Sequence, residues 1–119
     1  PGGIEEEARR IVAAARDGAR GLKVNKSLGF AIRDADGARV PIDDRRLDPI
    51  WRTAAALGLP VLIHSADPPA FFLRADRRNE RYEELVQNPD WARPPGRYPS
   101  FATLMAEPER LLARHAQMI

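Results

Sequence analysis

Residues 46–65, RLDPIWRTAAALGLPVLIHS, carry the signals of a helix that ends abruptly and is followed by an apolar strand. Asp48 is a natural N-cap, and Pro49 fits the first helical position, where its missing N–H is no loss. Gly58 predicts the end of the helix, and Pro60 prevents it from continuing. The apolar face of this helix is expected to comprise Ile50, Trp51, Ala54 and Leu57.

Two strands are predicted, each preceded by a helix. Residues 4–15 have apolar side chains at helical spacing, and Gly18 follows them as the expected helix end. A short strand is then predicted near residues 20–25, and the apolar run VLI with the histidine after it predicts another near residues 60–64. Strands that alternate with helices favour parallel pairing through a right-handed crossover.

The predicted fold class is therefore α/β, with about two βα units and the helices that follow them. A parallel sheet is usually covered on both faces and usually has more than two strands. We therefore interpret residues 1–119 as an internal fragment of a larger α/β protein. The alternative is a small complete α+β domain, in which a hairpin over residues 30–42, around the turn signal DADG, adds strands.

The second half of the chain is less regular. Residues 76–87, DRRNERYEELVQ, predict a helix, and residues 88–100 predict a loop rich in proline and aromatic residues. Trp91 and Tyr98 in that loop either line a pocket or pack on the surface, since long irregular loops often act as lids.

A final helix is predicted over residues 100–115, with Ser100 as its N-cap and a bend or break at Pro108. His115 near its end is expected to be structural, because the helix dipole favours a cation there. Trp51, on the apolar face of the earlier helix, is expected to lie in the core.

Composition excludes several classes of protein. The 119 residues include 19 lysine and arginine against 17 acidic residues, with no run of five like charges, which argues against a nucleic-acid-binding arm. With no cysteine, neither a disulfide framework nor a thiolate metal site is possible. No apolar run approaches the ~20 residues of a membrane helix, and the start does not resemble a signal peptide. We expect a cytoplasmic protein with no membrane partner.

His64 and Asp67 stand directly after the second predicted strand. Ligands of parallel α/β folds bind at the carboxyl ends of the strands, where a histidine can ligate a metal or act as a base. A histidine that is merely packed or hydrogen-bonded is the alternative. Asp67 either orients His64, contacts substrate or, before two prolines, simply forms a turn.

The first predicted strand carries polar side chains on one face. Lys23 and Asn25 share that face, and a lysine there can pair with a carboxylate, polarise a substrate oxygen or be carbamylated to bridge metals; a structural ion pair is the alternative. Lys26 and Ser27, just past the strand, either contact an anionic group or face water.

Four stretches of the chain resemble the amidohydrolase-related family, and more closely its metal-dependent hydrolases with a TIM-type barrel. They cover the chain from about residue 18 to its end, and the segment DDRRLDPIW…LGLPVLIH is the most specific. The stretches are GARGLKVNKSLG, VPIDDRRLDPIWRTAAALGLPVLIHSADPPAFF, NERYEELVQNPDW and RYPSFATLMAEPERLLARH.

The resemblance implies a partial (β/α)8 barrel that holds one or two divalent metals, often zinc. GLKVN would be its fourth strand and PVLIH its fifth. His64 matches the family's fifth-strand metal ligand, and Lys23 the fourth-strand lysine, which some members carbamylate. Asn25 stands where certain members have a second histidine. The family's H-x-H pair, its later histidine and its aspartate have no counterpart in this sequence, which stops where the sixth strand is expected.

The function implied is that of a metal-dependent hydrolase, in which metal-activated water attacks an amide, ester or lactone of a small-molecule substrate. The assigned roles are metal binding for His64, catalysis for Lys23 and Asp67, and substrate binding for Asn25, Lys26, Ser27 and Trp91. A metal-dependent decarboxylase of the same superfamily and a small non-enzymatic α/β interaction domain are the alternatives. The fragment alone is expected to be inactive, and the full-length parent can be a homo-oligomer.

Overall fold

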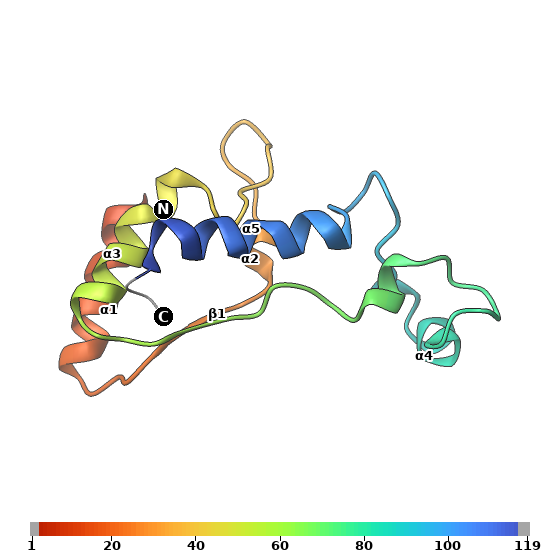
Figure 1. Cartoon of the computed structure of the whole chain (residues 1–119), viewed down its shortest axis with the longest axis horizontal. Helices are drawn as coiled ribbons and strands as arrows, with labels where there is room; N and C mark the ends of the chain where they lie inside the picture. The colour runs from red at the N-terminus through yellow and green to blue at the C-terminus, as the bar shows by residue number, and fades with distance from the viewer. Residues whose placement is uncertain (1–2, 117–119) are drawn as a thin grey trace.

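The computed structural model describes residues 3–116, which form a mixed α/β structure of 50 × 31 × 26 Å (Figure 1). None of the helices in this range has the length and apolar character needed to cross a bilayer. The elements in chain order are α1 (Gly3–Arg16), β1 (Leu22–Val24), α2 (Ser27–Phe30), η1 (Arg45–Leu47), α3 (Asp48–Ala56), β2 (Val61–Ile63), η2 (Pro69–Phe72), α4 (Tyr82–Gln87), η3 (Pro89–Trp91) and α5 (Phe101–Arg114).

Strands β1 and β2 form a two-stranded parallel sheet, as the alternation of helices and strands predicts. Leu22 lies opposite Val61 and Val24 opposite Ile63, so side chains of the same character share a face. Both strands lie within the predicted ranges. Helices together with a parallel sheet confirm the α/β class. Two parallel strands occur in many α/β folds, so the barrel stays a prediction.

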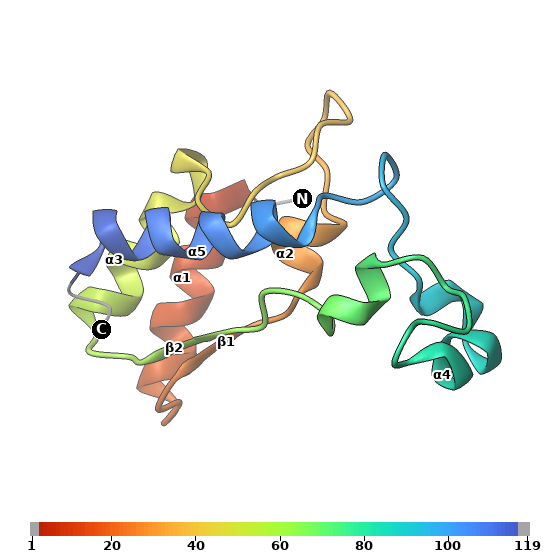
Figure 2. The same cartoon turned by 45° about the vertical axis from the view of Figure 1, so that its right-hand side comes forward.

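Helices α1, α3 and α5 gather on one face of this sheet (Figures 1 and 2). The apolar side chains of β1 and β2 point toward α1, α3 and α5, and burial of their apolar surface is the main force that holds the elements together. The core consists of Ile11, Val24, Val40, Ile42, Leu47, Ile50, Trp51, Ala54, Leu59 and Leu111. Trp51 is completely buried, as predicted, whereas Leu57 is exposed, because α3 ends before it.

Helix α3 begins one residue earlier than predicted, so Asp48 is its first residue and not its N-cap. The Asp48 side chain instead accepts a hydrogen bond from Arg114 and contacts His115 at the end of α5. His115 is buried, which agrees with its expected structural role. The predicted end of α3 is correct, because Gly58 adopts a left-handed φ of 66° that favours glycine.

Helix α5 continues unbroken through Pro108, contrary to the predicted bend or break. Leu104, Glu107 and Leu111 on its inner face are all buried, so tertiary contacts hold both halves of the helix in line. Its start agrees with the sequence, since the Ser100 side chain accepts a hydrogen bond from the Thr103 N–H.

The chain between β2 and α5 extends away from the helices toward the far end of the molecule (Figures 1 and 2). The helix predicted over residues 76–87 is shorter than expected and comprises only α4. Asn79 is the reason, because its side-chain amide donates to the carbonyls of Ala70 and Arg74 and holds the preceding residues in a loop.

The hairpin expected over residues 30–42 is reduced to a single antiparallel bridge between Arg33 and Arg39. The turn between them uses the predicted DADG residues, since Asp34 accepts hydrogen bonds from the backbone of Asp36 and Ala38. The described residues therefore contain no further strand that would complete a sheet around β1 and β2.

Candidate functional site

The candidate site lies at the carboxyl ends of β1 and β2. The His64 N–H donates to the Val24 carbonyl, so His64 and Asn25 follow the last paired residues of adjacent strands. Side chains alternate along each strand, which places both on the face opposite the helices, with Lys23 and Leu62. All four side chains are exposed, and Leu62 has 66% of its surface accessible.

One long edge of β1 has no strand beside it among residues 3–116. A hollow of about 240 Å³ lies there, lined mostly by apolar side chains of α1, β1, α3 and residues 27–32. A strand edge of this kind presents unpaired backbone N–H and C=O groups. The bare face and this edge are therefore suited to packing against further polypeptide.

Above the strand ends, three charged side chains from distant parts of the chain meet. Asp67 Oδ1 lies 2.5 Å from Lys26 Nζ, and Asp67 Oδ2 accepts a hydrogen bond of 2.8 Å from Arg93 Nε. The Asp67 side chain is only 7% exposed. The Arg93 guanidinium also lies 5.0 Å from the ring centres of Phe30 and Tyr98, a cation–π arrangement that fixes its orientation.

The surroundings of Asp67 keep it ionised. Burial by itself raises the pKa of its carboxyl. The hydrogen bonds from Lys26 and Arg93, together with their charges, lower this pKa by more than burial raises it. The net result is a pKa below the ordinary aspartate value of 3.8. Because the carboxylate is held between two cations, Asp67 is suited to positioning Lys26 and Arg93 and is poorly suited to accepting a proton.

The remaining predicted site residues are only partly brought together. Asp67 does not orient His64, whose Nε2 lies 3.0 Å from the Ala66 carbonyl. Asn25 and Ser27 form a local turn, in which Asn25 Oδ1 accepts hydrogen bonds from the Ser27 N–H and hydroxyl. Trp91 lies in the extended segment and packs against Phe71, with ring centres 5.9 Å apart.

Arg93 is the member of the site that the sequence does not reveal. It stands in an irregular stretch, ARPPG, with no periodicity to predict which way its side chain points. Its partner Asp67 is 26 residues away, and Lys26 is 41 residues from Asp67. The only available signal is the density of proline and aromatic residues around Arg93, which predicts a fixed loop but no particular contact.

Asp67→Asn is expected to lower the free energy of unfolding at neutral pH by about 1.5–3 kcal/mol, the cost of losing hydrogen bonds to charged groups. A carboxyl whose pKa is lowered by folding stabilises the protein above its ordinary pKa of 3.8, and this stabilisation is lost as the pH falls through the lower folded value. The difference between wild type and variant should therefore shrink below about pH 4. Urea unfolding across this range measures it.

Asp90→Asn is the matched control, because Asp90 is exposed and its side chain has no hydrogen-bond or ion-pair partner among the described residues. Its effect on stability should be small at every pH. An Asp67→Asn variant with the same pH dependence as wild type would contradict the assignment of an ionised, stabilising Asp67.

The side chains of the described residues do not form a recognisable metal-binding cluster at this site. No group of three or more histidine, cysteine, aspartate or glutamate side chains suited to a metal ion occurs within residues 3–116. A catalytic zinc site uses about three protein ligands. A metal bound through His64 would therefore need further ligands from other residues.

Comparisons with protein-family models, with curated proteins and with solved structures find no match to this chain. The fold itself defines the class of protein: it is mixed α/β, with a two-stranded parallel sheet covered by helices on one face.

Proposed function

We propose that this chain forms part of a metal-dependent hydrolase of the amidohydrolase type, with His64 as one metal ligand. Its substrate would be a small molecule with an amide, ester or lactone group. The observation that supports this most is the position of His64 beside Asn25 at the carboxyl ends of two parallel strands, on the face that the helices leave bare. This is the end of a parallel sheet at which ligands bind.

The bare face and the free edge of β1 support the barrel part of the proposal. In a closed barrel, helices cover the outer face of the strands and side chains of the inner face fill the lumen. Lys23, Leu62 and His64 would then point into the lumen, and the apolar hollow beside β1 would be filled by a neighbouring strand. An exposed Leu62 and an open strand edge are otherwise unfavourable in a finished domain.

The bound metal would supply a water of lowered pKa as nucleophile and would polarise the substrate oxygen. This chain would contribute side chains at the carboxyl ends of its two strands. His64 offers an imidazole nitrogen, and Lys23 offers an ammonium group on the same face. Asp67 holds Lys26 and Arg93 above the strand ends, where their charges would attract an anionic part of a substrate.

The test is the metal content of the full-length protein that contains this chain. After loading with zinc and dialysis, His64→Ala is expected to bind zinc more than about tenfold more weakly than wild type, because one ligand is lost. Asn25→Ala, on the same face but with no ligating nitrogen, is the matched control and should retain its zinc. Inductively coupled plasma mass spectrometry on equal protein amounts measures the metal bound.

Zinc content that is the same in His64→Ala and wild type would contradict the proposal. If metal binding depends on His64 but the enzyme releases carbon dioxide instead of adding water, the decarboxylase alternative is correct. The non-enzymatic alternative requires a buried, fully bonded His64, and its exposed imidazole therefore favours the enzyme.

A further inference from the structure

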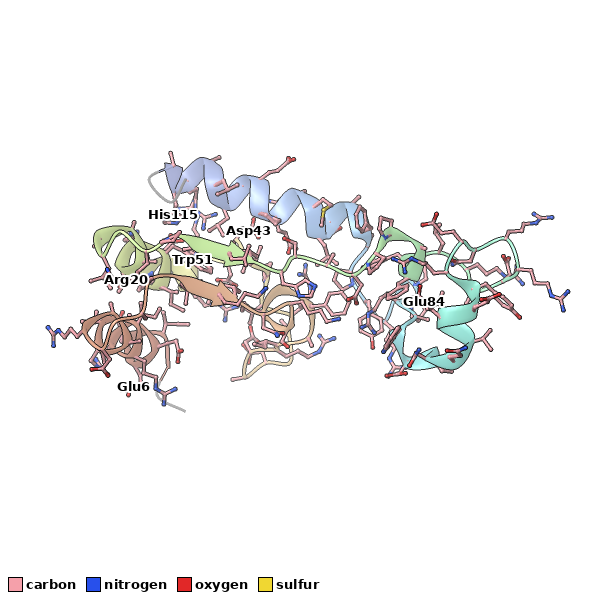
Figure 3. The ribbon with its side chains drawn as sticks, turned by 90° about the horizontal axis from the view of Figure 1, so that it is seen from below. Glu6, Arg20, Asp43, Trp51, Glu84 and His115 are labelled. Atoms are coloured by element: carbon pink, nitrogen blue, oxygen red, sulfur yellow. The ribbon has the colours of Figure 1, made fainter. Side chains whose placement is uncertain are left out.

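A polar pocket lies away from the strand ends, where the start of α3 meets the end of α5. It has a volume of about 290 Å³ and is lined by Arg45, Asp48, Arg52, Arg114 and His115. Figure 3 shows His115 at the end of α5, in the part of the molecule remote from Glu84 and the extended segment. None of these side chains belongs to the candidate hydrolase site.

The pocket carries an excess of positive charge. Three guanidinium groups and one carboxylate line it, so the excess is two charges before His115 is counted. The neighbouring carboxylates do not cancel it, because Asp43 pairs with Arg110 and Asp44 with Arg46.

The single carboxylate in the pocket is already engaged. Asp48 Oδ1 accepts a hydrogen bond of 2.8 Å from Arg114 and lies 3.0 Å from His115 Nε2. These contacts, together with the charge of Arg114, outweigh the effect of burial and hold the pKa of Asp48 below its ordinary value. Asp48 thus anchors Arg114 and His115 at the wall of the pocket.

The two remaining arginines are left with unused hydrogen-bond donors. Arg52 is 69% exposed and reaches Asp48 Oδ2 only at 3.9 Å, which is too long for a hydrogen bond. Arg45 has no side-chain hydrogen bond or ion pair to any of residues 3–116. The positive end of the α3 dipole adds to their field, while Arg114 offsets the negative end of α5.

We infer that this pocket binds a phosphate group, either free phosphate or that of a phosphomonoester. The phosphate group of a monoester carries about −1.5 to −2 charges at pH 7 and three strong acceptor oxygens. That charge matches the excess of two in the pocket, and the planar fork of an arginine binds two phosphate oxygens at once. This inference does not depend on the hydrolase proposal, because it concerns different residues.

Titration of the full-length protein with inorganic phosphate and, separately, with glycerol phosphate at constant ionic strength tests this inference. Saturable binding by isothermal titration calorimetry is expected, and Arg45→Gln or Arg52→Gln should weaken it by about tenfold or more, the cost of a charge-assisted hydrogen bond. Arg45→Lys keeps the charge but loses the fork and should give an intermediate affinity. Both arginines are exposed, so these variants should fold, which circular dichroism checks.

Arg78→Gln is the matched control, since Arg78 is exposed and lies in the extended segment; it should bind phosphate as wild type does. Acetate, with one charge, should bind much more weakly than phosphate. Binding of glycerol phosphate alone would identify a phosphomonoester as the ligand. Heats that do not saturate, equal binding of acetate, or wild-type affinity in both Arg45→Gln and Arg52→Gln would overturn the inference.

Discussion

Trp51→Ala is expected to lower the free energy of unfolding by about 3–5 kcal/mol, the usual cost of truncating a buried large aromatic residue. Trp51 belongs to α3, and its side chain is completely buried in the core that α3 forms with the strands and α5. The alanine variant loses the contacts of the indole ring and leaves a cavity that a packed interior refills only in part. Urea unfolding followed by circular dichroism measures the change.

Trp91→Ala is the matched control, because the same side chain is removed from a position that is 39% exposed. Its cost should be clearly smaller. Trp51→Phe gives a second comparison, since Trp51 Nε1 is buried without a hydrogen-bond partner among the described residues. Phenylalanine keeps much of the packing and removes that unpaired donor, so it should cost less than alanine. Equal losses in Trp51→Ala and Trp91→Ala would contradict the position assigned to the core.

Arg39→Ala is expected to destabilise the protein by about 3–5 kcal/mol, because it leaves a buried carboxylate without its partner. Glu107 on the inner face of α5 is only 2% exposed, and its two oxygens lie 2.5 and 3.1 Å from the Arg39 guanidinium. Arg39 Nη1 also donates to the Gly29 carbonyl at 2.6 Å. Chemical denaturation of the single variant measures the loss.

The double variant Arg39→Met with Glu107→Leu removes both charges and should recover much of that stability, since apolar pairs often replace buried ion pairs without loss. Arg9→Ala is the control on the surface, where Arg9 and Glu6 form an exposed pair, and should change stability by no more than about 1 kcal/mol. A single Arg39→Ala variant as stable as Arg9→Ala would show that Glu107 is not held by Arg39.

Much of the local structure follows from the sequence. The apolar spacing of residues 4–15 predicts α1, and GLKVN and VLI predict the two strands, because each signal lies within a few consecutive residues. The errors fall where a side-chain contact competes with the local helix preference. Asn79 binds carbonyls before it and prevents the longer helix predicted at residues 76–87. Burial of Leu104 and Leu111 keeps α5 continuous through Pro108.

The candidate site also has a part that the sequence predicts and a part that it does not. The alternation of side chains along β1 predicts that Lys23 and Asn25 share a face, and the structure confirms this. The contact between Asp67 and Arg93 could not be predicted, because loop residues have no period that sets the direction of a side chain. Of the alternatives for Asp67, orienting His64 is not what the structure shows, because its carboxylate pairs with Lys26 and Arg93 instead.

Composition and short-range pattern were enough to predict the α/β class, the two parallel strands and the buried position of Trp51. Helices and strands each have a characteristic spacing of apolar residues, which can be recognised within a short stretch of sequence. Which charges meet was decided by the tertiary structure alone. Lys26, Asp67 and Arg93 come together, as do Asp48, Arg114 and His115, only because packing of the apolar core brings distant segments to the same place. A contact between two charged residues that are far apart in the chain cannot be predicted from the residues next to either of them.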